Sequence, residues 1–271
     1  TAIRIHMISG IIYMIGVIVM DFFYPALYGI CGIIIGSFLN VCILRIPEGQ
    51  SFVTGRSHCP ACKRQLYPFD MVPVLSFLFL GGKCRFCGKP ISIQYPLVEA
   101  GTALLFFLCC LAKGPGAAAV IMCLFGSLLT VGAWIDARHM YIPDGISLSI
   151  LILAAASLMI LPLPDILSRM AGAAMCGGFL AVLRMLTKGG IGLGDVKLMA
   201  SSGLLLGVKA GMAALLAAYV LAGLWCLIPL IRGRVNGRTR IPMVPFFAIS
   251  LIAFGLWYRE IMTWYMGLFL P

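Results

Sequence analysis

Two aspartates, Asp136 and Asp195, each lie at the end of a strongly apolar segment, in WIDARHMYIPD and GIGLGDVKLMA. Charged residues make up only 11% of the chain, and ionisable groups near a bilayer are costly, so both carboxyl groups are functional candidates. Two carboxyl groups that meet from different segments predict acid–base chemistry on a water molecule. Taken singly, each has a simpler explanation: Asp136 is a charge at a helix end, and Asp195 is a helix N-cap.

Four cysteines form two C-x-x-C pairs inside the one long polar stretch of the chain: Cys59, Cys62, Cys84 and Cys87. Each short turn lets both sulfurs face one ion, and two such turns predict a tetrahedral zinc site. Four thiolates fill the coordination shell of zinc, so we expect a structural site with no open catalytic position. Redox-active C-x-x-C pairs are the alternative, but each pair would need a neighbouring helix N-terminus to activate it.

The composition predicts a membrane protein. The chain has 271 residues, 62% of them hydrophobic, with a mean hydropathy of +1.06. Repeated apolar runs of about 20 residues indicate an all-α, polytopic membrane protein. In such a protein, the net charge of +11 indicates an excess of basic residues in the cytoplasmic loops. No basic stretch is interleaved with stacking aromatic residues, so nucleic acid is not an expected partner.

We expect about eight transmembrane helices, with a small zinc-binding cytoplasmic insertion between the first two. The predicted spans are 22–44, 96–112, 117–135, 145–163, 166–186, 196–208, 210–231 and 243–269. Residues 1–21 form an N-terminal extension to which no role is assigned, and residues 45–95 are the insertion. The basic excess of the insertion places it in the cytoplasm. Alternation of the spans then brings both aspartates to the cytoplasmic side.

Several motifs, in this order, resemble the bacterial type IV prepilin peptidases, which are GxGD intramembrane aspartyl proteases. GSFLNVCILRIP at 36–47 resembles the first-helix signature of that family, and YPLVEAGTALLF after the cysteines resembles its second helix. WIDARHMYIPD resembles the segment of the first catalytic aspartate, and GIGLGDVKLMA contains GxGDxK, the second catalytic segment. RIPMVPFFA resembles the last-helix signature.

The resemblance implies an aspartic endopeptidase with Asp136 and Asp195 as its catalytic pair and residues 96–271 as its core. Such enzymes cut the short basic leader of prepilins and pseudopilins at the cytoplasmic face of the bacterial inner membrane. Many members then methylate the new N-terminus with S-adenosylmethionine, and the cysteine insertion is typical of these bifunctional members. No Gly-rich Rossmann fingerprint is present, so the methyl-donor site is not assigned. The expected partners are the prepilin substrates and membrane lipids.

Three further residues are expected to shape the site. Gly192 and Gly194 suggest a backbone that bends sharply or admits an extended substrate closely. Lys197 follows Asp195 closely and could tune its charge or bind a lipid phosphate. Because Asp195 precedes a helix and Asp136 ends one, the helix dipoles favour Asp195 as the more often ionised partner.

Two other classes of function remain open on the residues alone. In an ion-coupled carrier, Asp136, Asp195 and Glu99 would line a polar path. Carriers need access to both sides of the membrane, whereas the two aspartates are expected on one side. In a non-catalytic assembly scaffold, the zinc insertion would be a docking module, and Asp→Asn substitutions would be silent.

Overall fold

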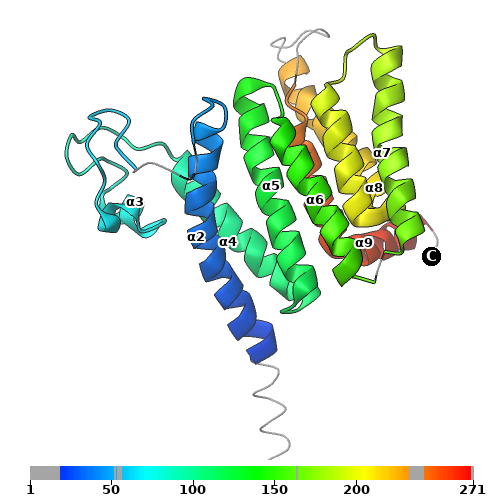
Figure 1. The fold of residues 1–271 in the computed structure, drawn as a ribbon, viewed down its shortest axis with the longest axis horizontal. Helices are drawn as coiled ribbons and strands as arrows, with labels where there is room; N and C mark the ends of the chain where they lie inside the picture. The colour runs from blue at the N-terminus through cyan, green and yellow to red at the C-terminus, as the bar shows by residue number, and fades with distance from the viewer. Residues whose placement is uncertain (1–18, 52, 54–56, 163, 232–240, 270–271) are drawn as a thin grey trace, which may run out of the picture. The chain divides into compact units, whose positions relative to one another are not determined.

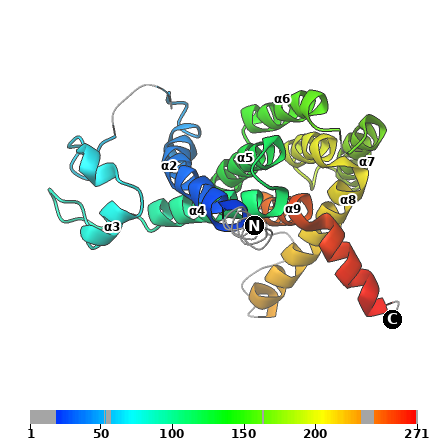
Figure 2. The ribbon, with the colours of Figure 1, turned by 90° about the horizontal axis from the view of Figure 1, so that it is seen from below.

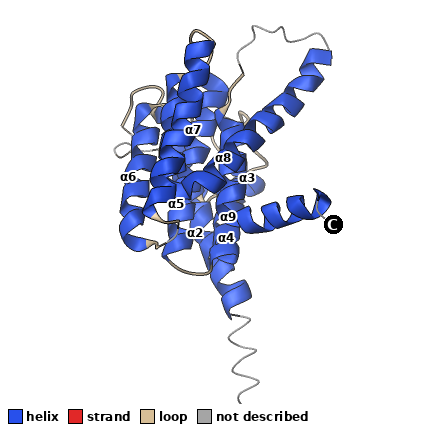
Figure 3. Cartoon of the chain, turned by 90° about the vertical axis from the view of Figure 1, so that its right-hand side faces the viewer, coloured by secondary structure: helices blue, strands red, loops and turns tan. Residues whose placement is uncertain are grey.

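The computed structural model describes residues 19–51, 53, 57–162, 164–231 and 241–269. Within these residues every regular element is a helix and no strand is formed (Figure 3). The predicted extension 1–21 lies outside the described residues up to residue 18, as does the basic run 232–240. The expectation of an all-α chain is confirmed for the described part.

Among the described residues, six helices are long and apolar enough to cross a membrane, since a span of about 30 Å needs about 20 residues. They are α2 (Tyr24–Arg45), α4 (Gln94–Lys113), α5 (Ala117–His139), α7 (Ile166–Leu186), α8 (Leu193–Ile231) and α9 (Val244–Phe269) (Figure 1). A shorter apolar helix, α6, spans Asp144–Ile160. The chain is therefore a multi-pass membrane protein.

Helix α8 contains a break that the sequence anticipates. It has 39 residues, but Gly207 inside it has φ +79°, a conformation that ends a right-handed helix. A side chain at Gly207 would also meet Ser168 Oγ at 2.9 Å. Two spans, 196–208 and 210–231, were expected here. With α8 counted as two segments and α6 included, the described residues contain the expected number of about eight apolar helices.

The chain divides into two compact units. The first comprises Thr1–Cys42 and Ser51–Cys123, and the second comprises Ile43–Gln50 and Leu124–Pro271. Beside α2, α4 and the start of α5, the first unit contains the polar insertion with a 3-10 helix, η2 (Pro68–Met71), and the short helix α3 (Leu75–Phe79). The four cysteines thus belong to the first unit and the two aspartates to the second.

In the first unit, α2 and α4 touch at backbone level because α2 presents glycines to α4. A Cβ atom on Gly32 would lie 2.6 Å from the carbonyl oxygen of Thr102, and one on Gly36 would lie 2.7 Å from Cα of Glu99. Small residues at such crossings let membrane helices approach closely and gain van der Waals contact. This crossing fixes α4 against α2.

In the second unit, α6, α7 and α8 lie side by side (Figure 1). The α7–α8 crossing is the tightest, because a Cβ atom on either Gly172 or Gly203 would lie 2.4 Å from the carbonyl oxygen of the other. No side chain larger than hydrogen fits at either position. The crossing fixes the first half of α8, whose first turn carries Asp195.

A buried arginine closes the turn between α6 and α7. Arg169 has no exposed surface, and it donates hydrogen bonds to Ser157 Oγ at 2.5 Å and to the carbonyl oxygen of Pro164 at 2.8 Å. Its second terminal nitrogen lies 3.4 Å from the carbonyl oxygen of Leu161, the C-cap of α6. The guanidinium therefore supplies donors to carbonyl groups that the ends of helices leave unpaired.

Candidate functional site

Asp136 lies in the last turn of α5 and is 7% exposed. Its Oδ2 accepts a hydrogen bond from the backbone N–H of Val244 at 3.0 Å, and the N–H of Met243 also bonds to the carboxylate. Both donors belong to the start of α9, where the first N–H groups of a helix have no partner within the helix. The carboxylate of Asp136 therefore caps the N-terminus of a second helix.

Asp195 lies in the first turn of α8 and is half-buried. Its carboxylate accepts a hydrogen bond from the backbone N–H of Gly192. A Cβ atom on Gly192 would lie 3.0 Å from Oδ2 of Asp195, so glycine at this position leaves room for the carboxylate. The first of the two predicted glycines thus contacts Asp195 directly.

In the second unit the two carboxyl groups lie close enough to interact electrostatically. They come from α5 and α8, and the third helix, α9, contributes backbone donors on the side of Asp136. The expectation that Asp195 is the more often ionised partner considered only the helix on which each residue lies. The structure adds the N-terminus of α9 beside Asp136, and hydrogen bonds from two backbone N–H groups stabilise its anion.

Two aromatic residues near the pair were not predicted from the sequence. Tyr219, in the second half of α8, interacts electrostatically with Asp195. Its ring contacts that of Phe247 edge to face, with centroids 6.0 Å apart, and Phe247 is only 1% exposed. Phe247 lies in the segment RIPMVPFFA, in which Pro242 precedes α9 and Pro245 lies in its first turn. These prolines indicate a helix start and were the one signal available in the sequence.

The remaining predicted site residues make contacts within the chain. A Cβ atom on Gly194 would lie 3.0 Å from Cβ of Ile142, so this glycine admits the segment that follows α5. Neither Gly192 nor Gly194 has a positive φ; within this loop Gly189 does, at +92°. Lys197 forms an ion pair with Asp144 at 2.8 Å, which links the first turns of α8 and α6.

The four cysteines of the insertion form one cluster that could hold a metal ion. Their Sγ atoms all lie within 4.8 Å of one another, and those of Cys59 and Cys87 are 3.9 Å apart. Four sulfurs around zinc, each about 2.3 Å from the ion, lie about 3.8 Å from one another. The residues present therefore fit a tetrahedral tetrathiolate site.

The two C-x-x-C pairs have the same backbone geometry. The N–H of Cys59 donates to the carbonyl oxygen of Arg64, and the N–H of Cys84 donates to that of Lys89, both at 2.9 Å. The residue after each pair has a left-handed conformation, with φ +60° at Lys63 and +67° at Gly88. We call each of these C-x-x-C turns a knuckle. Its geometry directs both sulfurs of the pair toward one point.

Backbone N–H groups stabilise a thiolate in the first knuckle, and a thiolate binds a metal cation. The N–H of Cys62, and to a lesser degree that of Ala61, lowers the pKa of the Cys59 thiol to about 6. A thiol with this pKa is ionised at neutral pH, and the thiolate is the form that binds metal. The alternative of redox-active pairs would need helix N-termini, whereas the described residues place both pairs in hairpin turns.

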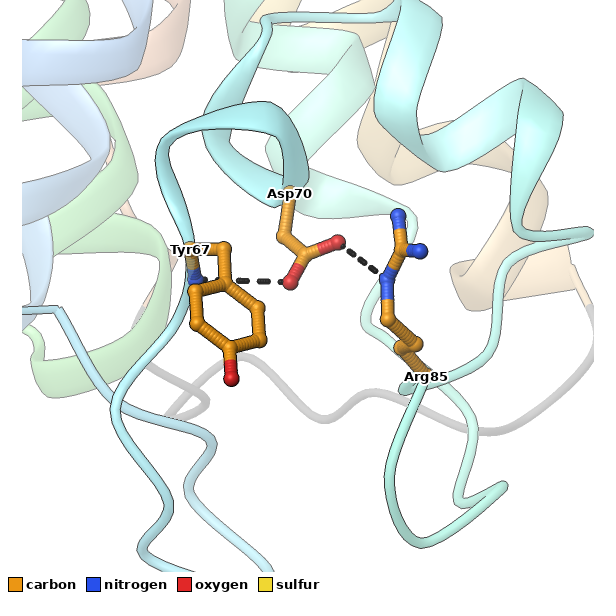
Figure 4. A network of polar contacts seen from close by, with 3 residues as sticks. All are labelled: Tyr67, Asp70 and Arg85. Atoms are coloured by element: carbon orange, nitrogen blue, oxygen red, sulfur yellow. Dashed lines mark hydrogen bonds and ion pairs between the residues drawn. The ribbon is translucent and has the colours of Figure 1, made fainter.

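The second knuckle is tied to η2 through Asp70 (Figure 4). The carboxylate of Asp70 forms an ion pair with Arg85 at 2.7 Å, and its other oxygen accepts the backbone N–H of Tyr67 at 3.4 Å. The side chain of Asp70 is 2% exposed, so this ion pair is shielded from solvent on one side. The insertion therefore has its own polar links besides the metal cluster.

Two family models match consecutive parts of the chain. Residues 30–113 match the bacterial peptidase A24 N-terminal domain, and residues 123–227 match the type IV leader peptidase family. No solved structure matches the chain significantly.

Curated relatives carry the name prepilin leader peptidase/N-methyltransferase. The protein from Bacillus subtilis (strain 168) is 38% identical over 88% of this chain and 96% of its own length. Those from Klebsiella pneumoniae and Aeromonas hydrophila are 37% and 32% identical, over 69% and 93% of this chain and 89% and 97% of their own lengths. Since these matches span both the cysteine cluster and the aspartate pair, the chain belongs to the type IV leader peptidase family.

Proposed function

We propose that this protein is a membrane-embedded aspartic endopeptidase that removes the short basic leader peptide of type IV prepilins and pseudopilins. The observation that carries the proposal is the electrostatic interaction of Asp136 on α5 with Asp195 on α8, beside the start of α9. The names of the relatives supply the class of substrate.

In the proposed mechanism the two carboxyl groups share one proton. The ionised carboxylate takes a proton from a water molecule, which attacks the carbonyl carbon of the scissile bond, and the protonated carboxyl group donates to the carbonyl oxygen. We assign the anion to Asp136, because the N–H groups of Val244 and Met243 stabilise its negative charge. Asp195 then holds the shared proton, and it interacts electrostatically with the phenol group of Tyr219.

The second proposed activity is methylation of the N-terminal amine that cleavage exposes. The relatives are named N-methyltransferases as well as leader peptidases, and S-adenosylmethionine is the methyl donor that we propose. The metal that we propose for Cys59, Cys62, Cys84 and Cys87 is zinc, in a structural role. Zinc would cross-link the two knuckles and leave no coordination position for a substrate.

The proposed organisation follows the charge of the loops. We assign residues 45–95 to a cytoplasmic zinc-binding domain, residues 22–44 to the first transmembrane helix and residues 96–271 to the protease core. The active site and the zinc domain would then face the cytoplasm from the bacterial inner membrane. Prepilins and membrane lipids are the proposed partners, and nucleic acid is not.

The test is cleavage of a purified prepilin in detergent by the wild type, Asp136→Asn and Asp195→Asn. We expect each variant to lose activity by about 100-fold or more, because an amide cannot replace either an acid or a base. Asp144→Asn is the matched control, since Asp144 lies near the same helix ends but pairs with Lys197. Cleavage by either dyad variant at the rate of the control would remove that residue from the chemistry and reject the proposal.

Methylation is tested separately, with a pre-cleaved substrate and isotopically labelled S-adenosylmethionine. The two aspartate variants should transfer the methyl group to that substrate at the wild-type rate if the two activities use different residues. No transfer by the wild type would reject the methylation proposal and leave the peptidase proposal intact.

A further inference from the structure

The short helix α3 presents an apolar face that no described residue covers. Leu75, Leu78 and Phe79 are 51%, 66% and 86% exposed, and their spacing of three and four residues puts them on one side of the helix. We call these three residues the α3 face. Large apolar side chains gathered at this exposure mark a surface that contacts something other than water.

The depth of α3 relative to α4 is set by a hydrogen bond. The backbone N–H of Val74, the residue before α3, donates to Oε2 of Glu99 at 2.7 Å. Glu99 lies five residues after Gln94, the first residue of α4, which is about 7–8 Å along the helix axis. Figures 1 and 2 both show α3 beside the first turns of α4. The start of α3 therefore lies level with the outer part of a membrane-spanning helix.

This attachment holds an unfavourable backbone conformation in place. Val74 has φ +61°, which is rare and strained for a β-branched residue. Such a residue persists only when its surroundings hold it. Glu99 is 6% exposed and lies against Gly36 of α2, so the acceptor is itself fixed between two helices.

The charge of the insertion suits an anionic surface. Residues 51–93 contain six basic residues and one acidic residue, Asp70, and Asp70 is already paired with Arg85. Zinc with four thiolates would carry two negative charges, which leaves the segment positive. Lys83 and Lys89, which follow α3 closely, are both exposed.

We propose that the α3 face inserts into the boundary between headgroups and acyl chains of a leaflet that contains anionic phospholipid, and that Glu99 holds it at this depth. Apolar side chains at this boundary gain burial, while neighbouring lysines meet the phosphate groups. The insertion would then be attached to the membrane at a third place besides α2 and α4. Its metal-binding knuckles would be held near the bilayer surface.

The test uses the full-length protein in nanodiscs of phosphatidylcholine and phosphatidylglycerol. A photoreactive benzoylphenylalanine replaces Phe79, and the adducts formed on illumination are identified by mass spectrometry. The matched control carries the same group at Phe86, an aromatic residue of the second knuckle that contacts Tyr67. We expect phospholipid adducts at position 79 in several-fold excess over position 86. Equal yields, no lipid adduct, or adducts mainly with protein would overturn the proposal.

Two further comparisons test separately whether basic charge and whether Glu99 contribute to insertion of the α3 face. Replacing Lys83 with Gln should lower the adduct yield at position 79 up to about fivefold, since one basic residue near an anionic surface contributes about 1 kcal/mol. Replacing Glu99 with Leu should lower this yield and speed amide exchange at Val74, whereas Gln, which keeps an acceptor oxygen, should preserve both. An unchanged yield and exchange rate in the Leu variant would reject Glu99 as the anchor.

Discussion

The carboxylate of Asp136, at the end of α5, accepts the backbone N–H of Val244, at the start of α9, over a separation of 108 residues. This contact makes the N-terminus of α9 part of the candidate active site. A helix N-terminus carries partial positive charge, so it favours a negative charge on the group that caps it. The residues at the start of α9 therefore contribute to the candidate site through their backbone N–H groups. The types of their side chains alone would not reveal this contribution.

Replacing Val244 with Pro should remove that donor and little else from the backbone. Proline is well tolerated at the first position of a helix, where its φ suits the helix and its missing N–H breaks no helical bond. A hydrogen bond to a charged group contributes about 1.5–3 kcal/mol, so kcat for prepilin cleavage should fall about 10- to 150-fold. The measurement is steady-state cleavage in detergent across a range of pH.

The matched control for this prediction is Val244→Ala, which shortens the same buried side chain but keeps the N–H. Alanine should lower thermal stability while kcat per folded molecule stays near that of the wild type. Equal losses of kcat in the Pro and Ala variants would show that packing of the side chain, and not the backbone donor, supports the site.

A second prediction concerns the crossing that fixes α8. Gly172→Ala should weaken cleavage and lower the unfolding temperature, because the added Cβ would lie 2.4 Å from a backbone oxygen that cannot move alone. Overpacking of this kind costs about 1–3 kcal/mol. Gly178→Ala, in the same helix with nothing within 4 Å of its Cβ, is the control and should be neutral or slightly stabilising. Thermal unfolding in detergent, followed by activity, distinguishes the two variants.

Hydrophobic runs and glycine positions predicted most of the helices, including the break in α8 near Gly207. They did so because membrane helices need about 20 apolar residues, which is a strong signal in sequence. The cysteine spacing predicted the cluster of four sulfurs because the cysteines lie in two local pairs. Asp136 and Asp195 stood out as rare charges at the ends of apolar segments, and the family resemblance then implied that they form the catalytic pair.

The parts that sequence reasoning missed depend on contacts between distant segments. The bond from Val244 to Asp136 needs the start of α9 to lie beside the end of α5, and the contact of Tyr219 with Phe247 needs the packing of α8 on α9. Likewise, the sequence suggested that Lys197 could tune Asp195 or bind a lipid phosphate, and it gave no sign of the ion pair with Asp144 of α6. Nothing in the local pattern of residues specifies these partners.

A third prediction tests the two knuckles. Lys63 and Gly88 occupy equivalent left-handed positions, at φ +60° and +67°. Lys63→Gly should therefore stabilise the folded knuckle or leave it unchanged, whereas Gly88→Val should weaken metal binding, because a β-branched residue is strained there by about 1–2 kcal/mol. Competition with a zinc chelator measures both, and the valine variant should release metal about tenfold more readily. Equal release by the two variants would show that the left-handed conformation at these positions does not affect metal binding.

The fourth prediction concerns the buried arginine between α6 and α7. Arg169→Met should keep the volume of the side chain but leave the oxygens of Ser157 and Pro164 without this donor, and the free energy of unfolding should fall by at least about 2 kcal/mol. Ser157 lies about 20 Å along α6 from its first residue, Asp144, beside which α8 begins. Cleavage per folded molecule should thus be unchanged.

Arg259→Met is the control for Arg169, because Arg259 is exposed in the second half of α9. Thermal unfolding of both variants in the same detergent gives the loss of stability, and the prepilin assay on the folded fraction gives the activity. A stable Arg169→Met variant would show that the turn between α6 and α7 finds other donors. A stable but inactive variant would instead connect this end of the helices to the aspartate pair.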